Sequence, residues 1–134
     1  MRRALPAAVL LLFSIAAACQ KPPKVATGRD LLTAPDRYDG ERVLVAGVAQ
    51  NPRKRMPATG PEYTSFTVAD GTDRVPVIAW GTQPVESGDL VEVRGVFRSQ
   101  MVVGGDVLND TIEAAFVRPL RKAMQPRGTP AGPP

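Results

Sequence analysis

The sequence predicts an all-β domain in which five strands close into a small barrel. Three observations lead to this prediction. A nine-residue pattern of glycine and valine occurs twice, and the residues between its copies alternate at the strand period of two. Helical periodicity is confined to a few residues near position 30. The chain has 134 residues, a length that suits one small domain.

The first 19 residues have the layout of an export signal. Arg2 and Arg3 precede an apolar run that ends in small residues and Cys19. The run is shorter than the roughly 20 residues that a membrane-spanning helix needs. Small residues followed directly by a cysteine resemble the lipobox of bacterial lipoproteins, although Ala16 stands where leucine is usual. The resemblance implies that Cys19 is acylated; the alternative is an ordinary signal peptide followed by a free thiol.

This N-terminus predicts where the protein is located. Residues 1–18 are expected to be a lipoprotein signal peptide, and residues 19–28 a polar tether. We therefore expect a lipid-anchored protein of the cell envelope that faces the periplasm, with the membrane as one partner. Gln20 replaces the aspartate that commonly retains lipoproteins at the inner membrane, which favours the outer membrane. Loss of Arg2 and Arg3 with the signal lowers the net charge of +4 by two, so any basic effect must be local.

The repeated pattern predicts two equivalent strands. Residues 40–48 and 88–96 both read G-x-x-V-x-V-x-G-V. Glycine inside a strand marks a bulge, a tight bend or a close approach, so Gly47 and Gly95 predict bends in long, coiled barrel strands. We expect the inner valines of both copies to share one core: Val43, Val45, Val91 and Val93.

Three further strands complete the predicted barrel. Residues 63–69 alternate, with Phe66 and Val68 on one face and Tyr63, Ser65 and Thr67 on the other, polar face, which is expected to be exposed. Residues 75–80 return after a turn at residues 70–72, and Pro76 restricts that strand to an edge or bulge position. The inner face of this strand stays open between two sets: Val75, Val77 and Ala79, or Ile78 and Trp80. Residues 111–117 form the closing strand, and residues 29–32 give at most one helical turn, ended by Pro35.

Four of these segments also resemble a known family. Residues 35–48, 64–72, 75–81 and 88–97 are similar to the motifs of the anticodon-binding-like OB-fold domains. The resemblance covers about residues 31–119 and implies a five-stranded Greek-key barrel. We therefore place an OB-fold domain at residues 29–120. Residues 121–134 are predicted to be a disordered, proline-rich tail.

The composition argues against catalysis. The chain has no histidine, which removes the commonest general base and the commonest transition-metal ligand. Its single cysteine is expected to be acylated, and its few serines have no histidine partner. The acids of the turns follow the ordinary preferences of turn residues: Asp70, Asp73, Asp106 and Asp110. We expect a protein that is not an enzyme and has neither metal nor cofactor.

The candidate binding residues lie on the face that the OB resemblance implies, along strands two and three and the loop after strand one. A basic run stands in that loop, and two aromatic residues are candidates for stacking. The alternatives are a solvated loop tip for the basic run and a core position for Trp80. The candidate ligand-binding residues are Arg53, Lys54, Arg55, Tyr63, Ser65, Arg74 and Trp80.

We therefore expect a membrane-anchored, non-catalytic binding or interaction module whose partner is an anionic ligand or an envelope protein. Three alternatives stay open. Single-stranded nucleic-acid binding follows from the OB resemblance but is disfavoured by the expected location. A haem-chaperone-like role is disfavoured because that family attaches haem through a histidine. The third alternative is a purely structural envelope protein, which would interact through a sheet face and bind no small ligand.

Overall fold

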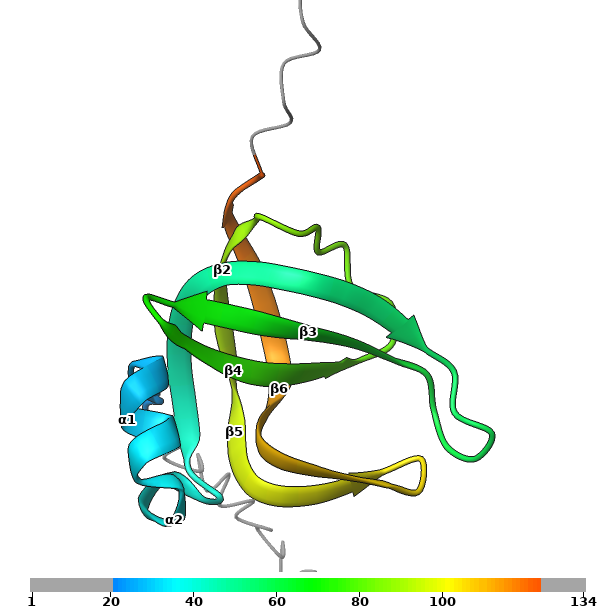
Figure 1. Cartoon of the computed structure of the whole chain (residues 1–134), viewed down its shortest axis with the longest axis horizontal. Coiled ribbons are helices and arrows are strands. Elements are labelled where there is room, and N and C mark those ends of the chain that lie inside the picture. Colours follow the sequence, from blue (N-terminus) through cyan, green and yellow to red (C-terminus); the bar gives the residue numbers. More distant parts are fainter. Residues whose placement is uncertain (1–20, 124–134) are drawn as a thin grey trace, which may run out of the picture.

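The computed structural model describes residues 21–123 and contains the predicted closed barrel (Figure 1). The strands follow one another in the ring order β2-β3-β4-β6-β5 and back to β2, and only β4 and β6 run parallel within this ring. The five-stranded Greek-key prediction is confirmed. The predicted signal, Cys19 and most of the predicted tail lie outside the described residues. The ring strands are β2 (Arg42–Arg55), β3 (Tyr63–Asp70), β4 (Asp73–Trp80), β5 (Leu90–Val103) and β6 (Asp106–Arg121).

The two copies of the repeat pair with each other. In the antiparallel register of β2 and β5, Val45 lies opposite Val93 and each interior glycine lies opposite a valine. Both glycines allow close approach of a third strand. A Cβ added to Gly47 would overlap the Ala69 carbonyl oxygen of β3, and one added to Gly95 would lie 2.8 Å from the Ala114 Cα of β6.

These contacts explain why both positions must be glycine. Gly95 also stands at a register shift between β5 and β6, as the predicted bend requires. One residue after Gly47, at Val48, the pairing of β2 with β5 ends and its pairing with β3 begins.

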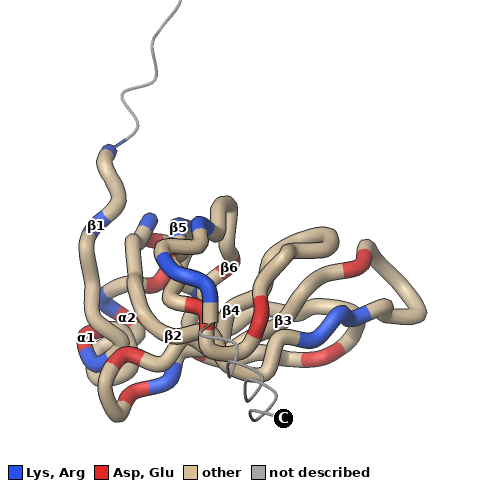
Figure 2. The backbone as a smooth tube through the Cα atoms, turned by 90° about the horizontal axis from the view of Figure 1, so that it is seen from above, with Lys and Arg blue, Asp and Glu red and all other residues tan. Residues whose placement is uncertain are grey.

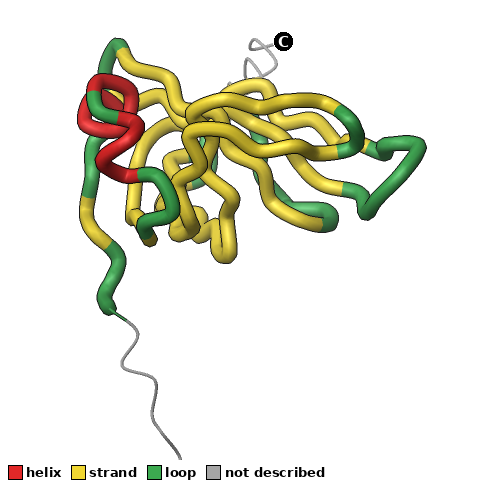
Figure 3. Tube along the Cα trace, turned by 90° about the horizontal axis from the view of Figure 1, so that it is seen from below, coloured by secondary structure: helices red, strands yellow, loops and turns green. Residues whose placement is uncertain are grey.

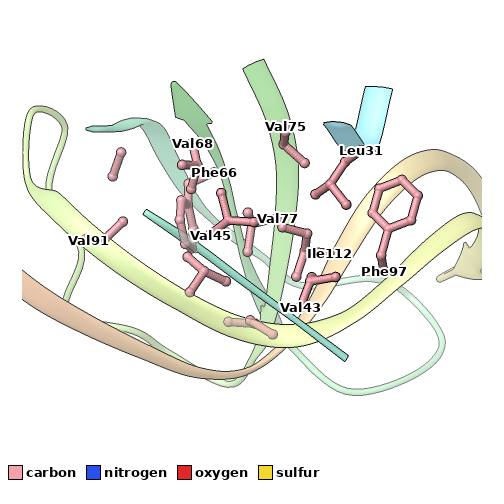
Figure 4. Packing of buried hydrophobic residues seen from close by; sticks show 14 of the residues in the cluster. Leu31, Val43, Val45, Phe66, Val68, Val75, Val77, Val91, Phe97 and Ile112 are labelled. Carbon is pink, nitrogen blue, oxygen red and sulfur yellow. The ribbon is translucent and has the colours of Figure 1, made fainter. Parts of the chain in front are cut away.

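The core fills the barrel and draws on all five ring strands (Figure 4). The four inner valines of the repeat copies are buried in it, as predicted: Val43, Val45, Val91 and Val93. On β4 the inner set is Val75, Val77 and Ala79, which settles the alternative that the sequence left open. Pro76 lies opposite Thr67 of β3, outside the short stretch of β4 that pairs with β6, and so occupies the predicted edge position.

A short helix closes one end of the barrel. The helix α1 (Gly28–Thr33) begins with a capping box in which Thr27 and Asp30 each accept a hydrogen bond from the other's backbone N–H. Its Leu31 is fully buried and lies near Phe97 in the core (Figure 4). The Gly28 N–H also donates to Asp70 at 3.0 Å, which joins the helix to the β3–β4 turn. Pro35 does more than end this turn, because it starts a second helix, α2 (Pro35–Tyr38), at a position where its missing N–H costs nothing.

The structured domain extends beyond both predicted boundaries. Within the predicted tether, β1 (Lys24–Val25) pairs in parallel with β2, and Ala26 is buried in the core. At the other end β6 continues to Arg121, so its last residue falls in the predicted tail. No helix within residues 21–123 is long and apolar enough to cross a membrane.

A buried carboxylate fixes the end of β6. Asp89 is fully buried and accepts hydrogen bonds from the Ala123 N–H at 2.7 Å and the Glu86 N–H at 2.9 Å. The Lys122 ammonium group adds a contact of 3.3 Å. These backbone donors hold the pKa of Asp89 below its ordinary value of 3.8.

We predict that Gly47→Val and Gly95→Val each destabilise the fold by at least about 2 kcal/mol, because the added side chain collides with a neighbouring backbone. Strand propensity alone would favour valine, so the sign of the change is informative. Ala46→Val on the exposed face of β2 is the control and should stay within about 0.5 kcal/mol of wild type in urea denaturation. Equal stability of Gly47→Val and Ala46→Val would contradict the close approach.

Asp89→Ala should remove about 2–3 kcal/mol at neutral pH, since it deletes a charged acceptor and leaves buried donors unpaired. A depressed pKa stabilises the fold above the ordinary value and loses that effect as pH falls through the folded value. The gap in unfolding free energy between wild type and Asp89→Ala should therefore shrink on acidification from about pH 7 to about pH 3. Asp106→Ala, at the exposed first residue of β6, is the control. A gap independent of pH would show that the charge of Asp89 is not the cause.

Candidate ligand-binding cleft

A cleft of about 820 Å³ lies on the outer face of β3 and β4. The β2–β3 loop and the β5–β6 hairpin, which contribute to its lining, lie at the opposite end of the barrel from the helices (Figure 1). The end of β2 and the loop after it form one wall, and the β5–β6 hairpin forms the other. Figure 3 shows this loop and the hairpin turn on the same side of the molecule. The lining residues are Asn51, Arg53, Lys54, Arg55, Met56, Pro57, Tyr63, Ser65, Phe66, Thr67, Pro76, Val77, Ile78, Gly104, Asp106, Leu108 and Thr111.

A β-bulge in β2 orients the basic side chains. Gln50 lies opposite Thr67 and Arg53 lies opposite Ser65, so β2 uses one residue more than β3 over this stretch. The extra residue is accommodated at Asn51, whose φ of 51° falls in the left-handed region that asparagine tolerates. Because side chains alternate along a strand, the bulge places Arg53 and Arg55 on the cleft face. Without the bulge, the alternation would turn Lys54 toward the cleft in place of Arg53 and Arg55.

The three basic residues differ in what holds them. The Lys54 ammonium group forms an ion pair with Glu62 at 3.4 Å, and Arg55 Nε donates to the Ser65 hydroxyl at 3.3 Å. Within residues 21–123 the Arg53 side chain has neither an ion pair nor a hydrogen bond. Figure 2 shows this basic stretch near the end of β2, far from the helices. Asp106 is the one acidic residue among those that line the cleft, so the lining has an excess of positive charge.

The prediction that Tyr63 lies on the exposed polar face is wrong. Tyr63 is only 7% exposed and belongs to a second hydrophobic cluster with Ile78 and Val103, against which Met101 and Leu108 also pack. The β5–β6 hairpin extends beyond the barrel and covers this part of the outer face. Tyr63 thus forms part of the cleft lining, but little of its ring is accessible to a ligand.

Two other predicted site residues lie away from the cleft. Trp80 is 40% exposed, so the core alternative for it is also wrong. Its ring meets that of Tyr63 edge-on, with centroids 6.0 Å apart, and lines a separate cavity of about 180 Å³ beside Phe116. Arg74 lies opposite Ala69 at the β3–β4 turn, next to the helical end of the barrel. The other five predicted residues all line the cleft: Arg53, Lys54, Arg55, Tyr63 and Ser65.

Sequence reasoning missed the contribution of the β5–β6 hairpin. Gly104, Asp106 and Leu108 all line the cleft, yet the sequence predicted a closing strand only from residue 111. The available signal was the Gly104-Gly105 pair, which has positive φ at both positions and joins two short apolar runs. Within residues 21–123 no group of three or more metal-ligating side chains is present.

Comparison with known proteins identifies the fold. No family model matches the sequence, and no curated protein matches it either. A structure assigned to an aspartyl-tRNA synthetase of Leishmania major Friedlin matches with a TM-score of 0.57 at 12% identity, over 82% of this chain and 23% of that chain. A chain of the structure of yeast Stn1 and Ten1 matches with a TM-score of 0.52 at 8% identity, over 75% of this chain and 64% of that chain. With the ring topology, these matches show that the chain contains an OB-fold domain.

Proposed function

We propose that this chain is a non-catalytic OB-fold binding module that takes an anionic ligand in the cleft, with single-stranded nucleic acid as the leading ligand class. The observation that supports this most directly is the bulge at Asn51, which places Arg53 and Arg55 on the cleft face. The name of the structural neighbour from Leishmania states an action on tRNA, and OB-folds bind oligonucleotides on this same face.

The chemistry of the cleft suits phosphate groups. Arginine forms paired, charge-assisted hydrogen bonds with phosphate oxygens, and Arg53 has no competing partner in the described part of the chain. Ser65 and Thr67 add hydroxyl donors along β3. The volume of about 820 Å³ lies within the range of ligand pockets, so the cleft can hold a short ligand or a short stretch of a polymer.

The cleft offers little aromatic surface. Tyr63 and Phe66 are buried, and Trp80 lies outside it. Stacking, which contributes about 1–3 kcal/mol per base in other single-strand binders, therefore contributes little here. We expect an affinity that is mainly electrostatic and that falls steeply with salt.

Exchange of both cleft arginines for glutamate, Arg53→Glu with Arg55→Glu, should weaken binding of a single-stranded oligonucleotide by about tenfold or more at low salt. The defect should become smaller toward 1 M salt, where the Debye length is about 3 Å. The matched control is Arg74→Glu, which makes the same charge change outside the cleft and should have a much smaller effect. Fluorescence anisotropy over a salt series measures both. If Arg74→Glu weakens binding as much as the cleft pair does, the cleft is not the site.

The second candidate is an envelope-anchored form of the same module, supported by the export signal that ends at Cys19. Four residues separate Cys19 from the start of β1 at Lys24, so these two residues can lie at most about 18 Å apart. An acylated Cys19 would therefore hold the domain close to the membrane. In that location the anionic ligand would be an envelope component or an envelope protein, and the cleft residues would have the same role.

Cys19→Ser should release the protein from the membrane fraction or block its processing, because it removes the only thiol that could be acylated. Cell fractionation and metabolic labelling with a fatty acid test this. Ser14→Ala, in the same apolar run, is the control and should leave fractionation unchanged. A Cys19→Ser protein that is processed normally and stays with membranes would contradict anchoring.

A further inference from the structure

The two walls of the cleft touch. Gly104, at the tip of the β5–β6 hairpin, lies so close to the loop after β2 that an added Cβ would stand 2.6 Å from the Pro57 Cβ. The same Cβ would lie 3.8 Å from the Thr59 carbonyl oxygen. Both Gly104 and Pro57 line the cleft. The loop and the hairpin are therefore in contact with each other along one side of the cleft.

Apolar packing against the sheet holds the β5–β6 hairpin next to the loop after β2. Its residues Val103, Met101 and Leu108 pack against Tyr63 and Ile78 of the sheet. Val103 is only 4% exposed. Because these side chains bury apolar surface, moving the hairpin away from the loop would expose the cluster to water. The second hydrophobic cluster therefore stabilises the position of the hairpin, and with it the contact between Pro57 and Gly104.

The contact between Pro57 and Gly104 limits which ligands can enter the cleft. A strand bound across an OB face runs between the loop after the first ring strand and the loop before the last one. Here those two segments are the β2–β3 loop and the β5–β6 turn, which meet at Pro57 and Gly104. A polymer that continued in both directions would have to pass through this contact. A ligand that ends inside the cleft would not.

We propose that the cleft binds the end of an anionic chain, or a short anionic molecule, through a terminal phosphate group, and excludes the interior of a continuous strand. This inference rests on the proposed function and specifies its ligand. Arg53 supplies the free guanidinium for the terminal phosphate, and Ser65 and Thr67 supply hydroxyl donors beside it. A terminal phosphate carries more negative charge than an internal one, which favours the end further.

The test compares three single-stranded oligonucleotides of one sequence, each about 16 nucleotides long and so at least as long as an OB-fold site. One has a 5′ phosphate, one has a 5′ hydroxyl, and one is closed into a circle. A 5′-phosphorylated dinucleotide is the short probe. The full chain without its signal is used, and binding is measured at low salt by competition against the labelled phosphorylated strand.

We expect the circle to bind at least about tenfold more weakly than the phosphorylated strand, and the dinucleotide to keep most of the affinity. Pro57→Gly removes the ring that meets Gly104, and should raise the affinity of the circle selectively. Pro61→Gly makes the same change in the same loop, at an exposed residue that does not line the cleft, and should leave the discrimination intact. Melting temperatures establish that both variants fold.

Each outcome decides between the two proposals. Equal affinity for circle and phosphorylated strand, both sensitive to Arg53→Glu, would overturn end recognition and leave the cleft as a nucleic-acid site. Strong binding of the dinucleotide with weak binding of the circle supports end recognition. Binding that favours the 5′ hydroxyl end over the phosphate would overturn the role given to Arg53. Failure of every probe to bind would overturn the nucleic-acid proposal together with the inference that rests on it.

Discussion

Two places where backbone packs directly against a crossing strand determine the shape of this molecule. Gly47 of β2 and Gly95 of β5 have no side chain, and a neighbouring strand occupies the space where a Cβ would stand. This lets two 14-residue strands curve around the barrel while remaining paired with each other. Each strand then continues past the barrel, one into the basic stretch and the other into the β5–β6 hairpin. The cleft is the space between these two extensions, so its existence depends on the two glycines.

One wall of the cleft is fixed by apolar packing, and the other carries basic side chains. The second hydrophobic cluster fixes one wall, and the bulge at Asn51 aims arginines from the other. Among the described residues, Arg53 is left without a partner, whereas Lys54 and Arg55 are tied to Glu62 and Ser65. Because Arg53 is exposed, its guanidinium can bind an anion without first breaking a contact within the described part of the chain. The local charge matters more here than the modest net charge of the chain.

The sequence was most informative about the barrel and least about its outer face. Valines at spacing two and the repeated glycines predict β2, β5 and their shared core, because strand period and steric contact are local properties. The position of Tyr63 could not be obtained in this way. Its alternation with Ser65 and Thr67 predicts an outer face, which is correct, but the hairpin that buries this face belongs to residues about 40 positions away. For Trp80, the apolar neighbours suggested a core position, whereas strand parity turns its ring outward.

The antiparallel pairing of two identical patterns also protects the fold against error. In the observed register Gly47 lies opposite Val91 and Gly95 opposite Val43, so each missing side chain is compensated across the ladder. A slip of two residues in one direction would set valine against valine at two successive pairs, and would leave Gly47 facing the charged Asp89. In that register the valine side chains would crowd together in the middle of the β2–β5 pair, and gaps would remain near its ends. The repeat therefore distinguishes the correct alignment of β2 with β5 from its nearest competitor.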